Sequence, residues 1–124
     1  MKIGIIILFY DNEKEIDSIQ FKNVFNQIKN TEICFVNNGS KDRTLQMLKF
    51  IKDDKNTNIH LLDIKKHIEP EAAIRAGARY FYNAKDLNCI GYVNAYNFND
   101  FNNLDKLLKA ADNYCNLIIN YSNI

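Results

Sequence analysis

Residues 33–51 constrain the fold more than any other stretch of the chain. Ile33 to Val36 is a short apolar run that includes β-branched and aromatic residues, which is typical of a buried strand. The Asn37-Asn38-Gly39 sequence follows, and Asn and Gly tolerate the positive φ angles of a sharp turn. Ser40 is then a suitable N-cap for residues 45–51, whose apolar side chains recur at helical spacing. The stretch predicts a strand, a polar turn at its carboxyl end and a helix, and ligands bind at such turns in open α/β sheets.

The same alternation of strand and helix runs along the whole chain. Further apolar runs predict strands, and apolar residues three or four positions apart predict helices between them. The predicted strands are residues 3–9, 33–36, 59–62, 89–93 and 117–121, and the predicted helices are residues 16–28, 45–51, 70–84 and 101–111. This order predicts an α/β fold with a doubly wound, mostly parallel sheet, helices on both faces and right-handed crossovers.

Individual residues refine this expectation for two of the helices. Pro70 suits the first position of its helix, where a missing N–H costs nothing. Gly77 lies in mid-helix, where Gly costs about 1 kcal/mol against Ala, so we expect close packing of the helix on the sheet there. The inner stripe of the first helix is assigned to Ile16, Ile19, Val24, Phe25 and Ile28.

Length and composition indicate a single globular domain, residues 1–124. A chain of 124 residues can bury a modest core. The net charge is +1 and the basic residues are scattered, which argues against a nucleic-acid surface. No apolar run approaches the roughly 18 residues that a membrane span needs. The apolar amino terminus lacks the small-residue cleavage site of a signal peptide, so a first strand is the better interpretation.

The cysteines point to a reducing compartment. Cys34, Cys89 and Cys115 are far apart in the sequence and lie in apolar surroundings. An odd number of buried cysteines fits reduced, structural thiols, so the expected localisation is cytoplasmic. Their spacing is not that of a metal site such as C-x-x-C.

Four motifs carry a resemblance to a known family. They are Ile5 to Glu13, ending in Tyr-Asp-Asn-Glu; Val36-Asn-Asn-Gly-Ser-Lys-Asp-Arg-Thr44; His67-x-Glu-x-x-x-Ala-x-Arg-x-Gly77; and Tyr92-Val-Asn-Ala-Tyr-Asn97. In order and spacing they resemble the amino-terminal, nucleotide-binding half of a family 2 glycosyltransferase with the GT-A fold. The second motif is the most specific, because the family has Val-Asp-Asp-Gly-Ser-x-Asp-x-Thr there. The match spans nearly all of the chain and implies a nucleotide-diphospho-sugar transferase-like fold.

The resemblance also implies which residues would bind a nucleotide. In the family, a tyrosine at the position of Tyr10 and an aspartate at the position of Asn38 help to hold the base of a nucleotide-sugar. Asn can also bond a base edge, since it offers a donor and an acceptor. The residues expected to bind nucleotide are Tyr10, Asp11, Asn38, Arg75, Asn94 and Tyr96.

The chain departs from the family where the metal would bind. The family's Asp-x-Asp falls at Asn94 and Tyr96; there the first aspartate contacts the ribose and the second helps to bind a divalent metal. Such metals prefer anionic oxygens, which neither side chain supplies at neutral pH. We therefore expect no divalent metal and no other cofactor. The family's catalytic base lies in an acceptor-binding region past this point, so no catalytic residue is carried over.

The leading hypothesis is a degenerate, truncated glycosyltransferase-like domain that acts as a weak nucleotide-binding module or a pseudoenzyme with a partner. An active, metal-independent glycosyltransferase completed by a partner chain is the alternative, so enzyme status stays open. A phosphoacceptor receiver domain is a third candidate, with Asp11, Glu13 and Asp63 as its acids. It lacks the expected Lys and helix after the strand at 117–121, and strand order distinguishes it from the glycosyltransferase.

Other candidates concern partners and anions. The apolar strand Leu117-Ile118-Ile119 is expected to mediate a homodimer or to contact a hetero-partner, because an uncovered apolar edge pairs with other chains.

A diphosphate could bind at basic residues or at the Gly39-Ser40 turn; the alternative is a solvated surface. The basic residues are Lys65, Lys66, His67, Arg75 and Arg79. His67 with Glu69 lacks a third metal ligand, and His60 is expected to be packed or exposed rather than catalytic.

Overall fold

The fold was analysed in a computed structural model that describes residues 2–84, 86–95, 106 and 108–109. Its elements are β1 (Ile3–Phe9), α1 (Ser18–Gln27), β2 (Thr31–Asn38), α2 (Thr44–Ile51), β3 (Ile59–Ile64), α3 (Pro70–Ala84) and β4 (Cys89–Asn94). The predicted strand at 117–121, and the partner contact assigned to it, lie outside the described residues. Of the predicted helix at 101–111, residues 106, 108 and 109 are described, and they are helical.

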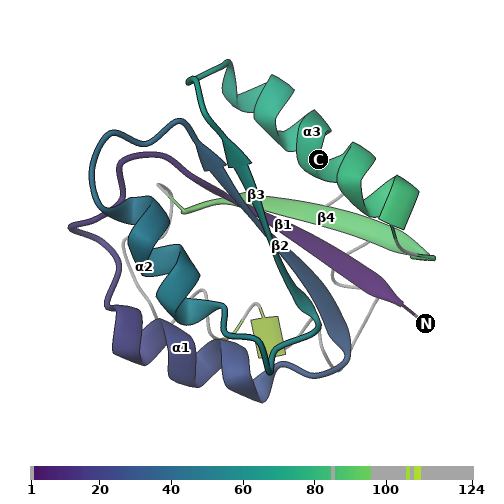
Figure 1. The fold of residues 1–124 in the computed structure, drawn as a ribbon. Coiled ribbons are helices and arrows are strands. Elements are labelled where there is room, and N and C mark those ends of the chain that lie inside the picture. Colours follow the sequence, from purple (N-terminus) through teal and green to yellow (C-terminus); the bar gives the residue numbers. More distant parts are fainter. Residues whose placement is uncertain (1, 85, 96–105, 107, 110–124) are drawn as a thin grey trace.

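The described strands form one parallel sheet in the order β3-β2-β1-β4 (Figure 1). Ile3 in β1 lies opposite Thr31 in β2 and Cys89 in β4. This confirms the predicted α/β class. It also excludes the receiver interpretation, because a receiver places its third strand beside the first and its second strand at the edge.

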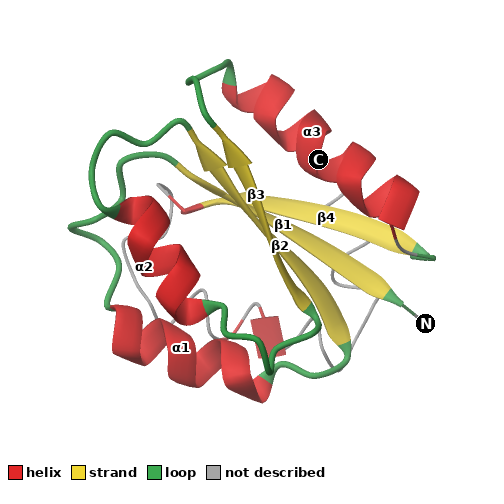
Figure 2. Ribbon diagram, viewed as in Figure 1, coloured by secondary structure: helices red, strands yellow, loops and turns green. Residues whose placement is uncertain are grey.

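Helices cover both faces of the sheet, as predicted (Figure 2). Successive strand residues point to opposite faces. In β1, Ile5 and Ile7 belong to the cluster that contains Phe25 of α1 and Leu48 of α2. Ile6 and Leu8 belong to the cluster on the other face, beneath α3. All seven residues of β1 are buried, as expected of a central strand with both faces covered.

Helix α3 packs closely on the sheet at Gly77. A Cβ added there would lie 3.0 Å from Cγ2 of Val36 and 3.1 Å from Cγ2 of Ile6. The close approach offsets the cost of a glycine in mid-helix and confirms the predicted packing position. Pro70 is the first residue of α3, also as predicted.

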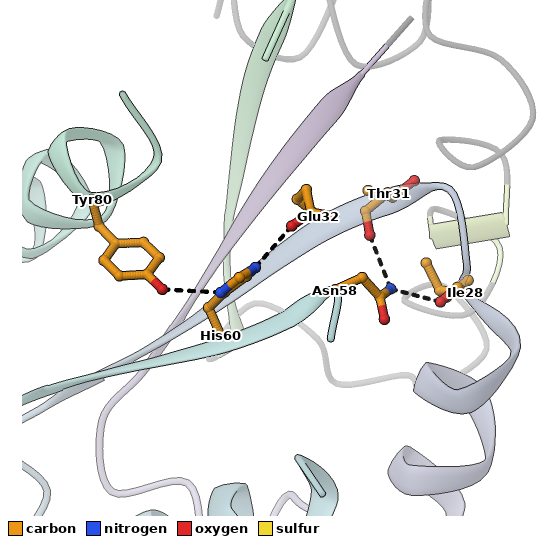
Figure 3. A network of polar contacts seen from close by, with 6 residues as sticks. All are labelled: Ile28, Thr31, Glu32, Asn58, His60 and Tyr80. Atoms are coloured by element: carbon orange, nitrogen blue, oxygen red, sulfur yellow. Dashed lines mark hydrogen bonds and ion pairs between the residues drawn. The ribbon is translucent and has the colours of Figure 1, made fainter. Parts of the chain in front are cut away.

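A polar network attaches the same helix to the strands (Figure 3). His60 in β3 contacts Oε1 of Glu32 in β2 through Nε2, at 2.8 Å, and the hydroxyl of Tyr80 in α3 through Nδ1, at 2.9 Å. His60 is therefore packed. Beside this network, Nδ2 of Asn58 donates to the carbonyl oxygens of Ile28 and Thr31, which fixes the connection from α1 to β2.

The predicted stripe of α1 was wrong at Ile19, a residue that is 68% exposed. The helix begins at Ser18, with Asp17 as N-cap accepting a hydrogen bond from the backbone N–H of Gln20. The other predicted residues, Ile16, Val24, Phe25 and Ile28, are buried, although Ile16 precedes the helix. Phe21, which was not predicted, is buried with Val24, Phe25 and Ile28 on one face, at intervals of three and four residues. Ile19 lies outside that face. None of the helices in the described part of the chain is long and apolar enough to cross a membrane.

Candidate functional site

Three of the expected site residues end or directly follow strands at one edge of the sheet, whereas Arg75 lies in α3. Tyr10 directly follows β1, Asn38 is the last residue of β2, and Asn94 is the last residue of β4. Since these strands are parallel neighbours, their carboxyl ends share an edge. The strand order reverses between β1 and β4, and in open α/β sheets ligands bind at this switch point. Tyr96 lies outside the described residues.

Two loops at this edge are joined by hydrogen bonds from backbone to side chain. The backbone N–H of Asp11 donates to Oγ of Ser40 at 3.0 Å, and that of Lys41 donates to Oδ1 of Asp11 at 2.7 Å. The backbone N–H of Asn12 donates to Oγ1 of Thr44 at 2.8 Å. We call residues 11–13 with residues 40–44 the loop clasp. Asp11 has a φ of 48°, an unusual value for a residue with a side chain.

Two carboxylates of the loop clasp occupy the amino terminus of α2. Asp42 accepts from the backbone N–H groups of Glu13, at 3.1 Å, and Thr44, at 2.9 Å. Glu13 accepts from the backbone N–H of Arg43 at 2.9 Å. Partial burial alone would raise the pKa of Asp42, but hydrogen bonds from Thr44 and Glu13 outweigh it and lower the pKa.

These contacts correct two predictions for the turn. The N-cap position of α2 is held by Arg43, and Ser40 instead donates to Oδ1 of Asn37. The candidate anion site at Gly39-Ser40 is not formed, because the carboxylates of Glu13 and Asp42 already accept the N–H groups at the start of α2. A second anion there would meet like charge.

The side chain of Asn38 holds the loop after β3. Its Nδ2 donates to the carbonyl oxygen of Ile68 at 2.8 Å, and its Oδ1 accepts from the N–H of Ile68 at 3.0 Å. Asn38 is buried. Base binding by Asn38 stays a prediction, and a base at this amide would compete with both hydrogen bonds.

His67 lies against Tyr10, a pairing that our reading of the sequence missed. The ring centroids are 4.0 Å apart and the ring planes are inclined by 31°. Nδ1 of His67 lies 3.0 Å from the carbonyl oxygen of Asn38, and because a carbonyl only accepts, Nδ1 carries the hydrogen. The sequence did contain one indication of this pairing. His67 lies in the loop that follows β3, and the carboxyl end of β3 lies at the same edge of the sheet as that of β1.

The five candidate basic residues are all exposed. Lys65 pairs with Asp63, and the hydrogen bond from Lys65 is the main reason why the pKa of Asp63 is lowered, followed by that from Asn37. Arg75 and Arg79 are exposed on α3, whereas Ala73 on its inner face is buried. This arrangement favours the solvated surface over a diphosphate site.

Among the described residues, the donors at this edge do not suit a divalent metal. Oδ1 of Asp11 is bonded to Lys41, and Asp63 is bonded to Lys65 and Asn37. Within the described ranges, no three His, Cys, Asp or Glu side chains are grouped so that they could hold a metal ion. Asn94 supplies a neutral amide, a weaker ligand than a carboxylate.

Asn12 has a buried polar atom without a partner. Its Oδ1 accepts from the backbone N–H of Tyr10 at 2.7 Å, and the residue is 1% exposed. Its Nδ2 has no hydrogen-bond partner among the described residues. A buried donor left in this state costs about 1–3 kcal/mol, which an acceptor on a bound molecule or a water would offset.

The described cysteines are free thiols, Cys34 buried and Cys89 partly buried. Burial raises the pKa of Cys34 to about 12, so its thiol stays protonated at neutral pH and is unreactive. This agrees with the structural role predicted for it. Cys115 lies outside the described residues.

Comparisons with known proteins agree with this architecture. The crystal structure of residues 1–349 of TarS from S. aureus is similar, with a TM-score of 0.61 and 16% sequence identity. The match covers 92% of this chain and 33% of the TarS chain, so the chain spans about a third of that structure. No curated protein matches it significantly. The family model described as "Glycosyl transferase family 2" matches residues 4–122, so the chain belongs to glycosyltransferase family 2.

Proposed function

We propose that this chain binds the nucleotide part of a nucleotide-sugar at the carboxyl edge of β1, β2 and β4. One observation carries the proposal: Tyr10 and Asn94 flank the point between β1 and β4 where the strand order reverses. Family membership supports it. Ligands of open α/β sheets bind outside the strand ends at this point.

Each expected contact has a physical basis. Tyr10 is 39% exposed as a residue, and a tyrosine ring is a surface on which a base can stack. Asp11 follows Tyr10 in the loop after β1, and Asn94 ends the neighbouring strand β4, opposite Leu8, so both offer polar groups near where a ribose would fall. Arg75 and Tyr96 remain expected contacts from the family pattern.

Binding is proposed to be weak and independent of metal. In the family a bound divalent metal neutralises the diphosphate of the nucleotide-sugar. The carboxylates described at this edge are bonded to neighbouring residues, and Asn94 is neutral. The diphosphate therefore adds little to affinity, and the leaving group lacks its usual stabilisation. We propose that the chain alone does not transfer sugar.

Calorimetry of the purified protein with UDP, GDP, CDP and ADP, each with and without Mn²⁺, tests this function. We expect one of them to bind with an affinity that Mn²⁺ leaves unchanged. Tyr10→Ala should weaken binding roughly tenfold, since stacking a base on an aromatic side chain contributes about 1–3 kcal/mol. Tyr82→Ala is the matched control, because that tyrosine is 85% exposed on α3.

Other outcomes would contradict the proposal in different ways. Absence of binding by every nucleotide would refute the binding function. Tight binding that needs Mn²⁺ and is lost in Asn94→Ala would refute metal independence. Turnover of a nucleotide-sugar by the pure protein would favour the alternative, an active glycosyltransferase.

A further inference from the structure

We propose that His67 positions Tyr10, by covering one face of its ring so that the opposite face is held ready for a nucleobase. The inference rests on the proposed function, because it concerns how the same edge recognises its nucleotide. It adds His67 to the residues expected to bind nucleotide, which did not include it.

The two rings lie close enough to act as one unit. Their centroids are 4.0 Å apart, within the range in which aromatic rings attract each other. An interplanar angle of 31° places the rings nearly face to face, so no base fits between them. Tyr10 as a whole residue nevertheless keeps 39% of its surface exposed. With His67 against one face of the ring, a base would approach the opposite face.

His67 is held in place by the end of β2. Its Nδ1–H donates to the carbonyl oxygen of Asn38 at 3.0 Å, and the side chain of Asn38 bonds both backbone polar groups of the next residue, Ile68. Gly39, with a φ of 66°, lies directly against this segment. A Cβ added to Gly39 would lie 2.3 Å from the backbone nitrogen of His67.

Tyr10 is held from its backbone. Its N–H donates to Oδ1 of Asn12 at 2.7 Å, and Asp11 is bonded within the loop clasp. Displacing His67 would break a hydrogen bond and disturb the packing on Gly39. Adding a base to the open face breaks neither. The arrangement thus favours a stack of three rings, with His67 beneath Tyr10 and the base above it.

Two substitutions of His67 separate the ring from the hydrogen bond. His67→Phe keeps an aromatic ring and loses the donor to Asn38. His67→Asn keeps an amide donor and loses the ring. If the ring positions Tyr10, we expect His67→Asn to weaken nucleotide binding about fivefold, or about 1 kcal/mol, and His67→Phe to stay within about twofold of wild type.

The histidine signals in an NMR spectrum supply a readout that loss of structure would not mimic. The chain has two histidines, His60 and His67. His60 lies in the network with Glu32 and Tyr80, at the other end of the strands. Adding the nucleotide that binds in calorimetry should shift the imidazole signal of His67 and leave that of His60 in place.

The outcomes distinguish this inference from the proposed function. Wild-type affinity in His67→Asn, or equal losses in His67→Asn and His67→Phe, would overturn the inference while nucleotide binding stands. An unmoved His67 signal at saturation would do the same. If no nucleotide binds to the wild type, both fail. Thermal unfolding of each variant shows whether it is folded; His67→Gln, which also lacks a ring, replaces an unfolded His67→Asn.

Discussion

Asp42 joins three parts of the molecule with a single carboxylate. It accepts from the backbone of Glu13 in the loop after β1, and from the backbone and hydroxyl of Thr44 at the start of α2. Such bonds replace the missing intrahelical partners of the first helical N–H groups. Asp42 and Thr44, in the motif that runs from Val36 to Thr44, therefore have a structural role. Their hydrogen bonds hold the loops beside the site in place.

The ionised form of Asp42 is expected to stabilise the fold. Its pKa is lowered in the folded protein, so this stability is present above the unfolded pKa of about 3.9 and is lost as pH falls through the folded pKa. Asp42→Asn should lower the free energy of unfolding by about 1 kcal/mol at pH 7. The difference should shrink as pH falls below the unfolded pKa of about 3.9, because protonation progressively neutralises the wild-type carboxyl.

Urea unfolding of both proteins at pH 7 and pH 3 measures this effect. Asp54→Asn is the matched control, because Asp54 is exposed. An Asp42→Asn variant as stable as the control at pH 7, or a loss of the same size at both pH values, would contradict the role assigned to Asp42.

The sequence located the polar residues of the site and missed their partners. Tyr10, Asn38 and Asn94 follow apolar runs, so their positions at strand ends could be predicted. The partners of Asn38 and Tyr10 are Ile68 and His67, which come from a distant loop. Periodicity describes local structure, and contacts of this separation depend on tertiary packing.

Helix α3 is held to the sheet by packing at one point and by polar contacts at another. Gly77 allows close approach, and Tyr80 reaches His60, which in turn contacts Glu32. The rings of Tyr80 and Phe81 also lie near His60, at 5.5 Å and 6.1 Å between centroids. The helix and two strands are thus linked through one imidazole.

Tyr80→Phe should destabilise the protein by about 1 kcal/mol. The change keeps the ring and removes the hydroxyl, which leaves a largely buried nitrogen of His60 without this partner. Tyr82→Phe, two residues along the same helix and 85% exposed, should change stability by less than about 0.5 kcal/mol. Chemical denaturation of the two variants makes the comparison, and equal effects would show that the hydroxyl of Tyr80 contributes nothing.

The sequence predicted which strands and helices form better than it predicted where they begin and end. β2 was expected at residues 33–36 and runs from Thr31 to Asn38, because the ladder to β1 continues through polar residues that an apolar pattern omits. The helix after it was expected to be capped by Ser40 and begins at Thr44. The groups that cap a helix depend on which loop lies beside it in the fold. Here Glu13, from the loop after β1, accepts a hydrogen bond from the backbone N–H of Arg43 at the start of α2.

At the scale of the whole molecule, the strand order makes β1 central. It pairs with β2 on one side and β4 on the other, and helices cover both of its faces. Alternation of strands and helices predicted a parallel sheet, but it is compatible with more than one strand order. The order itself comes from the structure, and β3-β2-β1-β4 separates this chain from a receiver domain.

Amide hydrogen exchange should show that the central strand β1 is more strongly protected than the edge strand β3. The amides of Ile5, Ile6 and Ile7 lie in a strand that is wholly buried and paired on both sides, so they can exchange only when the domain unfolds globally. Those of β3, residues 59–64, lie at the edge of the described sheet in a strand that is mostly half-buried, so local opening can release them sooner. We expect the protection of the β1 amides to match the free energy of unfolding from urea denaturation, and that of β3 to be smaller. Slower exchange in β3 than in β1 would contradict the central place of β1 in the stability of the molecule.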